Sequence, residues 1–435
     1  MNIYNAKKVL MVGIAGSGMR GLAYLLTETG KQVIGTDSDS DGITSMPQKE
    51  KYTLVDERAA VEAVKNADVL ILTDAVSKRH SVFKAAIKEG IEIVFYQEAL
   101  AQLVNRYKVI AVAGTHGKTS TSALISHIML GEGFDPSVLL GAGIKEWGNK
   151  SSRIGRGKYF IVEADEYRNH FFQLKPDIAV ITSIDYDHAD FFSSLDDVRA
   201  SFSKFMDNVA ADGRVVVGRN THDEHKTVSW HKNTVIVEES SQDAMTNIYG
   251  EHMRRNAVLA MRVGEAVGIP TASILEHINN FGGVNRRMEE LGSYKGMPII
   301  SDYGHHPTEI VATLKSFREK YIDKRVLVIF EAHTLKRLTT FKDNFAKALL
   351  AADGVLLAPV FVPAGREREE RDAKQFVKLF GRELKKSNMS VGKLSNWQAL
   401  RDALDDVSEE FDVVLAFTAG VADRYLREIV DKRNL

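Results

Sequence analysis

The 435-residue sequence contains no cysteine. Disulfide bonds, thiolate nucleophiles and thiolate metal ligands are therefore excluded. The chain also lacks an excess of charge of one sign, because 57 Lys and Arg residues nearly balance 58 Asp and Glu residues and leave a net charge of −1. Such a balance is not typical of proteins whose main partner is nucleic acid or an anionic membrane. We predict neither partner.

Long apolar runs are missing as well. No stretch approaches the roughly 20 apolar residues that cross a bilayer, so we expect no membrane insertion. The opening residues, MNIYNAKKVLMVGIAG, contain only a short apolar run that leads into a glycine turn, which is not the pattern of a signal peptide. We therefore expect a cytoplasmic protein, as a monomer or a weak homodimer.

The composition that remains, 44% hydrophobic and 26% charged, is ordinary for a globular protein. A chain of 435 residues is too long for one core, so we expect two or three domains. Strands that alternate with helices predict α/β domains with mostly parallel, doubly wound sheets. Three such blocks follow one another along the chain, at residues 1–104, 105–287 and 288–435.

The most informative stretch is VIAVAGTHGKTS at residues 109–120. A predicted strand enters a glycine turn, which delivers Lys118 and Thr119 to the start of a predicted helix. Backbone N–H groups in such a turn bind polyphosphate, the lysine reaches the β- and γ-phosphates, and the hydroxyl holds Mg²⁺. Val112 stands where the P-loop pattern has its first glycine. We predict ATP binding by Gly114, Thr115, His116, Gly117, Lys118, Thr119 and Ser120.

A second glycine turn, GSGMRG at residues 16–21, matches G-x-G-x-x-G between a predicted strand and a predicted helix. Asp37 ends the next predicted strand, where dinucleotide-binding folds place a ribose-binding acid. Three interpretations stay open: NAD binding, binding of the diphosphate of a nucleotide sugar, and close helix–strand packing without a ligand. The candidate ligand residues are Gly16, Ser17, Gly18, Met19 and Asp37.

Acidic residues follow two further predicted strands of the second block. EADE at residues 163–166 ends one strand, and DYDHAD at 185–190 follows the strand predicted at Ile178–Ser183. Carboxylates beside a nucleotide suit Mg²⁺, and the imidazole of His188 suits Mn²⁺ better. The alternatives are a solvated acidic loop at EADE and a structural histidine at His188. The motif HDEH at 222–225 has the wrong spacing for a zinc motif, so we predict that it lies on the surface.

Two motifs flank the start of the third block. NRRM at residues 285–288 contains paired arginines, which bind phosphate groups in a bidentate manner. SDYGHHP at 301–307 follows a predicted strand, so that Asp302 could accept a hydrogen bond from a ribose hydroxyl, and Pro307 opens a predicted helix.

Taken in order, these motifs resemble the Mur ligases, the ATP-dependent amide-forming enzymes of peptidoglycan precursor synthesis. The resemblance covers nearly the whole chain, and GTHGKT combined with DYGHHPTE is specific. The matching stretches are GIAGSGMRGLA at 13–23, AVAGTHGKTSTSALI at 111–125, GKYFIVEADEY at 157–167, PDIAVITSIDYDHADFF at 176–192, FGGVNRRME at 281–289, SDYGHHPTEIVATL at 301–314 and VIFEAHTLKRL at 328–338.

The resemblance implies three domains: a Rossmann-like domain (1–104) that binds a UDP-sugar, a P-loop-type ATPase domain (105–287) with a mostly parallel sheet, and a Rossmann-like domain (288–435) that binds the amino acid and closes over the nucleotide. It implies that L-alanine is joined to the lactyl carboxylate of UDP-N-acetylmuramate through an acyl phosphate, with ADP and phosphate as products. A ligase that adds a tripeptide is the alternative within the family, and an NAD-dependent oxidoreductase or an inactive nucleotide-binding module are the alternatives outside it.

The resemblance also implies residue roles. The catalytic residues would be Lys118, Glu163, His188, Arg286, His333 and Arg337. Thr119, Glu163 and His188 would hold Mg²⁺ or Mn²⁺, and His252, Asn256, Arg286 and Asp302 would complete the ATP site. His305 would join Gly16, Ser17, Gly18, Met19 and Asp37 in binding the sugar nucleotide. The chain departs from the family pattern at Tyr167–His170, Met253, Ala332, Leu335-Lys336 and Thr418.

Overall fold

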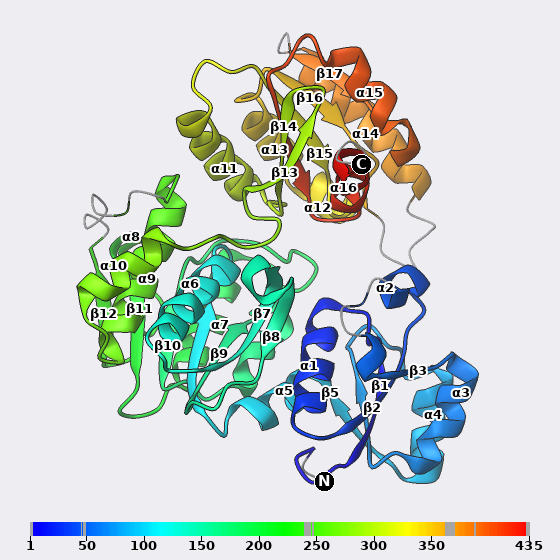
Figure 1. The fold of residues 1–435 in the computed structure, drawn as a ribbon, viewed down its shortest axis with the longest axis vertical. Coiled ribbons are helices and arrows are strands. Elements are labelled where there is room, and N and C mark those ends of the chain that lie inside the picture. The colour runs from blue at the N-terminus through cyan, green and yellow to red at the C-terminus, as the bar shows by residue number, and fades with distance from the viewer. Residues whose placement is uncertain are drawn as a thin grey trace. The chain divides into compact units, whose positions relative to one another are not determined.

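The computed structural model describes residues 3–44, 46, 49–238, 245, 248–361, 370–386 and 389–431. Three β-sheets with helices on their faces account for most of these residues (Figure 1). The chain separates into two compact units. The first comprises Met1–Asn247 and Arg255–Gly282, and the second comprises Ile248–Arg254 and Gly283–Leu435.

The first sheet is fully parallel, with the strand order β3-β2-β1-β4-β5. Its strands are β1 (Lys8–Val12), β2 (Gln32–Thr36), β3 (Thr53–Leu54), β4 (Val69–Leu72) and β5 (Glu92–Phe95). Its helices are α1 (Ser17–Glu28), α2 (Ser40–Thr44), α3 (Glu57–Ala63), α4 (Ser81–Glu89) and α5 (Tyr96–Val104). The chain order reverses beside β1, and ligands of such sheets bind at the carboxyl ends of the strands next to that point.

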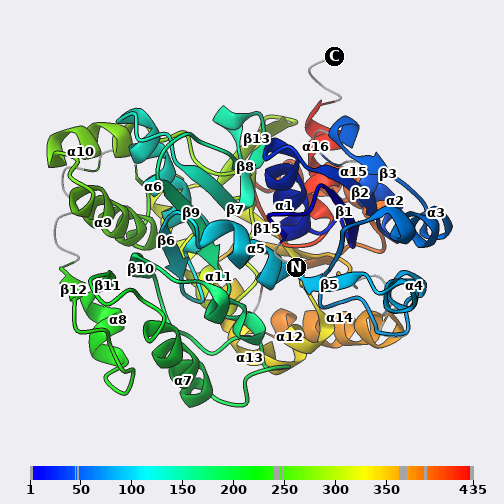
Figure 2. The same ribbon diagram turned by 90° about the horizontal axis from the view of Figure 1, so that it is seen from below.

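The second sheet has the order β12-β11-β10-β6-β9-β7-β8, and only β7 and β8 pair antiparallel. Its strands are β6 (Lys108–Ala113), β7 (Ser137–Ile144), β8 (Lys150–Arg153), β9 (Tyr159–Ala164), β10 (Ile178–Ile181), β11 (Arg214–Gly218) and β12 (Thr234–Val237). The helices that follow are α6 (Lys118–Gly131), α7 (Leu195–Met206), α8 (Arg219–Glu224), α9 (Glu251–Ala266) and α10 (Thr271–Asn279). Helix α6 packs against α10 (Figure 2).

The third sheet, in the second unit, has the order β13-β14-β18-β15-β16-β17, with β13 and β14 as an antiparallel hairpin. Its strands are β13 (Glu289–Tyr294), β14 (Met297–Asp302), β15 (Val326–Glu331), β16 (Gly354–Leu357), β17 (Ser390–Lys393) and β18 (Val413–Thr418). Its helices are α11 (Pro307–Lys320), α12 (Leu335–Thr340), α13 (Lys342–Leu349), α14 (Glu370–Lys385), α15 (Leu400–Val407) and α16 (Ala422–Asp431). The central strands β15 and β18 are buried throughout, because helices cover both faces.

The predicted α/β class with mostly parallel sheets is confirmed. The strand predicted at Ile178–Ser183 ends earlier, at Ile181. The hydroxyls of the next two residues, Thr182 and Ser183, donate to the carbonyl of His116 in the loop after β6. The prediction that HDEH lies on the surface is wrong for His225, which is 5% exposed and accepts a hydrogen bond from Nε of Arg199. Within the described ranges, every helix is too short or too polar to cross a bilayer.

Candidate active site

The predicted phosphate loop connects β6 to α6. Gly114 and Gly117 have φ angles of +136° and +84°, a region that side-chain-bearing residues rarely adopt. A Cβ on Gly114 would lie 2.1 Å from Oγ1 of Thr182, and one on Gly117 would lie 2.6 Å from Oδ1 of Asn256. Glycine is therefore required at both positions. Asn256, predicted to contact adenine, packs against this loop from α9.

Part of the loop is already occupied by bonds within the protein. The N–H of Thr115 donates to the carbonyl of Ser183 (3.1 Å), and the N–H of His116 donates to Oγ of Ser183 (2.8 Å). His116 Nε2 lies 3.0 Å from a carboxylate oxygen of Asp185. These bonds shape the loop and leave fewer backbone donors for phosphate than the sequence pattern suggests.

Lys118, at the first turn of α6, forms an ion pair with Glu166. Its Nζ lies 2.9 and 3.2 Å from the two carboxylate oxygens of Glu166 and also donates to the carbonyls of Gly114 and Thr115. Glu166 is 2% exposed. Burial lowers the pKa of Lys118, but the charges of Glu166 and its acidic neighbours outweigh burial and leave this pKa above its ordinary value. The sequence pattern places Glu166 in the acidic motif EADE but gives it no role of its own and does not predict this ion pair.

The end of β9 brings Glu163 to Thr119. Strand β9 pairs with β6 in parallel, so its acidic end lies one strand from the phosphate loop, as predicted. Oγ1 of Thr119 donates to Glu163 (3.0 Å), and the N–H of Gly141 on β7 donates to the other carboxylate oxygen. A hydroxyl and a carboxylate in contact form an oxygen donor set that suits Mg²⁺.

The predicted metal ligands group His188 with Glu163, but the structure places His188 beside Glu166. Its Nε2 is 3.8 Å from Glu166, and its ring lies tilted against that of Tyr167, with the centroids 4.7 Å apart. One ligand atom each from Asp165, Glu166 and His188 lie within 4.8 Å of one another. The loop after β9 thus supplies two carboxylates next to this imidazole, which is a donor set that divalent cations accept.

In the first sheet, the glycine turn between β1 and α1 adopts the expected geometry. Gly16 is the N-cap of α1, and Gly13 has a φ angle of +83°. Asp37 accepts hydrogen bonds from the N–H groups of Ala15 (2.8 Å) and Asp39 (2.9 Å), so its carboxylate holds the turn. A Cβ on Gly18 would lie 2.7 Å from the hydroxyl of Tyr96, so the turn closely approaches α5.

In the second unit, Asp302 holds the chain that enters β13. Its carboxylate is 4% exposed and accepts hydrogen bonds from the N–H groups of Met288 (3.0 Å) and Gly304 (2.8 Å). The guanidinium of Arg286 lies over the ring of Tyr303, at 4.7 Å from the centroid. Its Nε and Nη2 are buried and have no hydrogen-bond partner among the described residues. Buried donors of this kind are usually paired, so Arg286 points to an anionic ligand.

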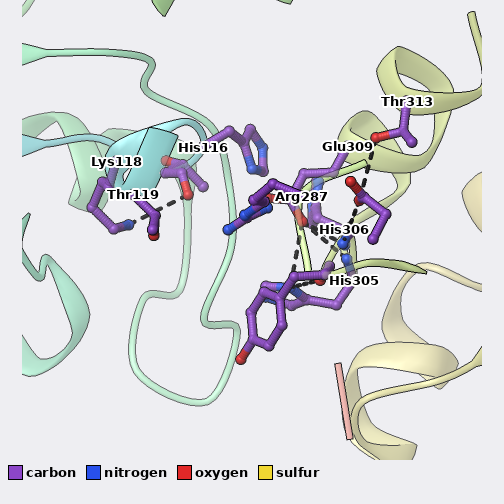
Figure 3. Close-up of polar contacts among 12 residues, drawn as sticks. His116, Lys118, Thr119, Arg287, His305, His306, Glu309 and Thr313 are labelled. Atoms are coloured by element: carbon purple, nitrogen blue, oxygen red, sulfur yellow. Dashed lines mark hydrogen bonds and ion pairs between the residues drawn. The ribbon is translucent and has the colours of Figure 1, made fainter. Parts of the chain in front are cut away.

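The remaining predicted residues of the second unit gather around α11 and the end of β15. The N–H groups of His305 and His306 donate to Glu309 at 2.9 and 3.2 Å (Figure 3). The ring of His305 lies 5.4 Å from that of His333, whose Nδ1 accepts a hydrogen bond from Arg337 (3.1 Å). The structure thus brings His305, His333 and Arg337 together.

His252, predicted to contact adenine, lies in the second unit. Its Nδ1 is 3.3 Å from Oγ of Ser316 on α11. Burial lowers the pKa of His252, although Asp302 opposes this shift. The imidazole is therefore favoured in its neutral form, which can both donate and accept a hydrogen bond.

Three family models match the chain in order. The model described as Mur ligase family, catalytic domain, matches residues 8–108, the Mur ligase middle domain matches 112–265, and the Mur ligase glutamate ligase domain matches 286–420. Together they cover the three sheets.

Curated relatives and solved structures agree with these matches. The chain is 30% identical to the UDP-N-acetylmuramate–L-alanine ligase of Caldanaerobacter subterraneus, over 97% of this chain and 98% of the relative. It is 31% identical to the enzyme of that name from Rhizobium etli, over 95% and 94%. The crystal structure of UDP-N-acetylmuramate-alanine ligase from Thermotoga maritima shares the fold, with a TM-score of 0.81 at 23% identity over 98% of this chain and 99% of that one.

A murein peptide ligase from Psychrobacter arcticus also shares the fold, with a TM-score of 0.73 at 21% identity over 98% of each chain. The matched models, the near-complete coverage of the relatives and the two glycine turns at strand ends lead to the same conclusion. The chain belongs to the Mur ligase family.

Proposed function

We propose that this chain is an ATP-dependent ligase that joins L-alanine to the lactyl carboxylate of UDP-N-acetylmuramate in peptidoglycan precursor synthesis. The curated relatives carry that activity in their names at about 30% identity over nearly their full length. The observation in the structure that carries the proposal is the contact between Thr119 of the phosphate loop and Glu163 at the neighbouring strand end (3.0 Å). It joins a nucleotide-binding turn to a cation-binding carboxylate.

In the proposed reaction, a lactyl carboxylate oxygen attacks the γ-phosphorus of ATP and ADP leaves. The amine of L-alanine then attacks the acyl carbon, an amide bond forms, and phosphate leaves. Phosphoryl transfer depends on positioning and charge neutralisation more than on covalent help from the protein. Lys118 exchanges its bond to Glu166 for a bond to the phosphates, and the free donors of Arg286 bind the same anion after the domains close.

Mg²⁺ or Mn²⁺ would be held by Thr119, Glu163 and His188. Thr119 would hold one ion, and Glu163 with His188 would hold a second, which would shield the carboxylate and the phosphate from each other. Oxygen atoms from the first two residues are already in hydrogen-bond contact, which fits such an ion. His188 contributes from the loop after β10, beside Glu166.

The amino-acid site is proposed at His333 and Arg337. Because a guanidinium only donates, the bond from Arg337 requires an unprotonated Nδ1 on His333 and leaves its Nε2 as a donor. We infer that His333 binds a carboxylate or carbonyl oxygen of the incoming amino acid. Addition of a tripeptide is the second candidate, since a murein peptide ligase shares the fold. Coupled ADP release with UDP-N-acetylmuramate, comparing L-alanine with the tripeptide, distinguishes the two.

The variant Lys118→Ala tests the phosphate-loop assignment. We expect the rate of ligation to fall by at least about 100-fold, because the loop loses its charged phosphate ligand. Binding of UDP-N-acetylmuramate, measured by calorimetry, should remain. Lys108→Ala is the matched control. Lys108 begins β6, the strand that leads into the phosphate loop, and its side chain pairs with Asp177. Unchanged turnover in Lys118→Ala would contradict the assignment of residues 114–120 as the phosphate-binding loop.

We further infer that the enzyme works in the cytoplasm, where ATP is available, and that it is a monomer or a weak homodimer. An NAD-dependent oxidoreductase is disfavoured, because it would leave the Lys118 and Glu163 contacts without a role. A change in the nicotinamide fluorescence of NADH when it is mixed with the protein would support that alternative.

A further inference from the structure

The segment Tyr167–His170, where the chain departs from the Mur ligase pattern, forms a tight turn after β9. Arg168 and Asn169 have φ angles of +51° and +60°, which cost energy for residues other than glycine. The turn is held on both sides: the N–H of Asn169 donates to the carbonyl of Glu166 (3.0 Å), and its side chain accepts from Ser201 on α7 (2.5 Å). The turn therefore has a defined conformation, and the side chain that follows has a defined direction.

That side chain is His170, whose imidazole lies between two carboxylates. Its Nε2 is 2.6 Å from Oδ2 of Asp74, and its Nδ1 is 3.7 Å from Oδ2 of Asp165. The side chain is 17% exposed. Burial lowers the pKa of His170, but the nearby carboxylates of Asp165 and Asp74 outweigh burial and leave this pKa above its ordinary value. Asp74 follows β4 of the first sheet and Asp165 follows β9 of the second, so the imidazole joins the two sheets.

Each end of this link lies next to one of the two candidate anion sites. Asp74 follows Thr73, whose methyl group packs so closely on Gly13 that a Cβ there would lie 2.2 Å away. Gly13 begins the turn that leads into α1. On the other side, Asp165 precedes Glu166, which holds Lys118 of the phosphate loop. The link thus connects the glycine turn of the first sheet to the loop after β9 in the second sheet, where Glu166 forms the ion pair with Lys118.

We propose that His170 is a positioning residue that, through Asp74 and Asp165, sets the distance between the sugar-nucleotide turn and the phosphate loop. This inference rests on the proposed function, in which the lactyl carboxylate bound in one site must reach the γ-phosphate bound in the other. A misplacement of about 1 Å costs on the order of 100-fold in rate when two reactants must meet. Loss of the link therefore lowers kcat more than it weakens the binding of either nucleotide alone.

The absence of cysteine permits a test of the geometry that does not depend on activity. In the full chain carrying Asp74→Cys and His170→Cys, the only two thiols lie on the two sides of the link. A short bis-maleimide should join them within one molecule, which shifts the mobility of the denatured chain. Each single-cysteine variant, treated in the same way, is the control and should give no such shift. Failure of the pair to crosslink would overturn the proposed proximity.

The role is tested by kinetics on His170→Phe, Asp74→Leu and the double variant. We expect kcat to fall by about tenfold in each single variant. The double variant should lose no more than this, because each single variant already breaks the same contact between His170 and Asp74. The dissociation constants of ATP and of UDP-N-acetylmuramate, each measured alone, should stay within about twofold. Asp74→Asn retains an acceptor oxygen and should restore most of kcat. His222→Phe, which alters a ring beside Trp230, is the control.

Thermal unfolding of each variant confirms that it is folded before it is assayed. Single variants with unchanged kcat, or losses that multiply in the double variant, would overturn the inference. If the wild-type chain shows no ATP-dependent ligation, the proposed function fails, and the crosslink still decides whether positions 74 and 170 lie next to each other.

Discussion

Glu166 shows how a single buried charge shapes the phosphate loop. Its carboxylate is 2% exposed, bonds Nζ of Lys118 and lies 3.8 Å from His188. In the proposed ATP site, it would compete with the nucleotide phosphates for the lysine and would repel them directly. In Glu166→Gln, we expect ATP to bind about threefold to tenfold more tightly in the absence of divalent cations, because one negative charge is removed at short range.

Calorimetric titration with ATP in the presence of a chelator measures this effect. Glu146→Gln is the matched control, because Glu146 pairs with His127 in an exposed contact. Weaker binding of ATP by Glu166→Gln would show that Glu166 supports the loop rather than competing with the nucleotide.

At the scale of elements, β7 and β9 together hold the candidate cation ligand. Gly141 on β7 has an ordinary backbone conformation, and a Cβ there would lie 3.0 Å from Glu163 and 3.3 Å from Thr119. Gly141→Ala should therefore crowd the two ligands without altering them. We expect the concentration of Mg²⁺ or Mn²⁺ that gives half-maximal rate to rise by about threefold or more, with a larger rise for Glu163→Ala. A metal titration identical to that of the wild type would argue against a role for Thr119 and Glu163 in binding the cation.

Asp353 ties β15 to α11 in the second unit. Its carboxylate accepts hydrogen bonds from the N–H of Val326 (2.6 Å) and from Arg318 (2.8 Å). Partial burial raises the pKa of Asp353, but these two bonds outweigh burial and leave this pKa below its ordinary value. A lowered pKa means that the stabilisation is complete above the unfolded value of about 3.9 and is lost as the pH falls through the folded value.

We therefore expect Asp353→Asn to lower Tm at neutral pH and the difference from wild type to shrink as the pH falls below about 3.9. Calorimetric scans from neutral pH to about pH 3 measure it, and Asp343→Asn, on an exposed side chain of α13, is the control. A difference that grows as the pH falls would contradict the assignment.

At the scale of the whole molecule, the proposed reaction needs residues from both compact units. Lys118 and Glu163 belong to the first unit, and Arg286 and Asp302 belong to the second. Site assembly on closure would also keep water from the acyl phosphate. We expect the radius of gyration in X-ray scattering to fall when a non-hydrolysable ATP analogue and UDP-N-acetylmuramate are added together. Lys118→Ala should show a smaller change. An unchanged radius in the wild type would mean that the site forms without closure.

Much of this chain could be predicted because its chemistry lies at strand ends in local motifs. Residues 109–120 contain an apolar strand, a glycine turn and a helix start in one stretch, so local rules sufficed to place Lys118. Strands β7 and β8 escaped prediction, because β7 contains two glycines and β8, with the sequence KSSR, contains no apolar residue. The boundaries of the three domains and the roles of individual site residues stay predictions.

The sequence by itself determined the α/β class, the two glycine turns and the acidic strand ends, because backbone conformation and apolar periodicity act over a few neighbouring residues. Only the tertiary structure decided which partners these residues take. Glu166 reaches Lys118 across 48 residues of chain, and His170 reaches Asp74 across 96. Such pairings depend on the order of strands in the sheets and on how the sheets pack, which no local pattern encodes.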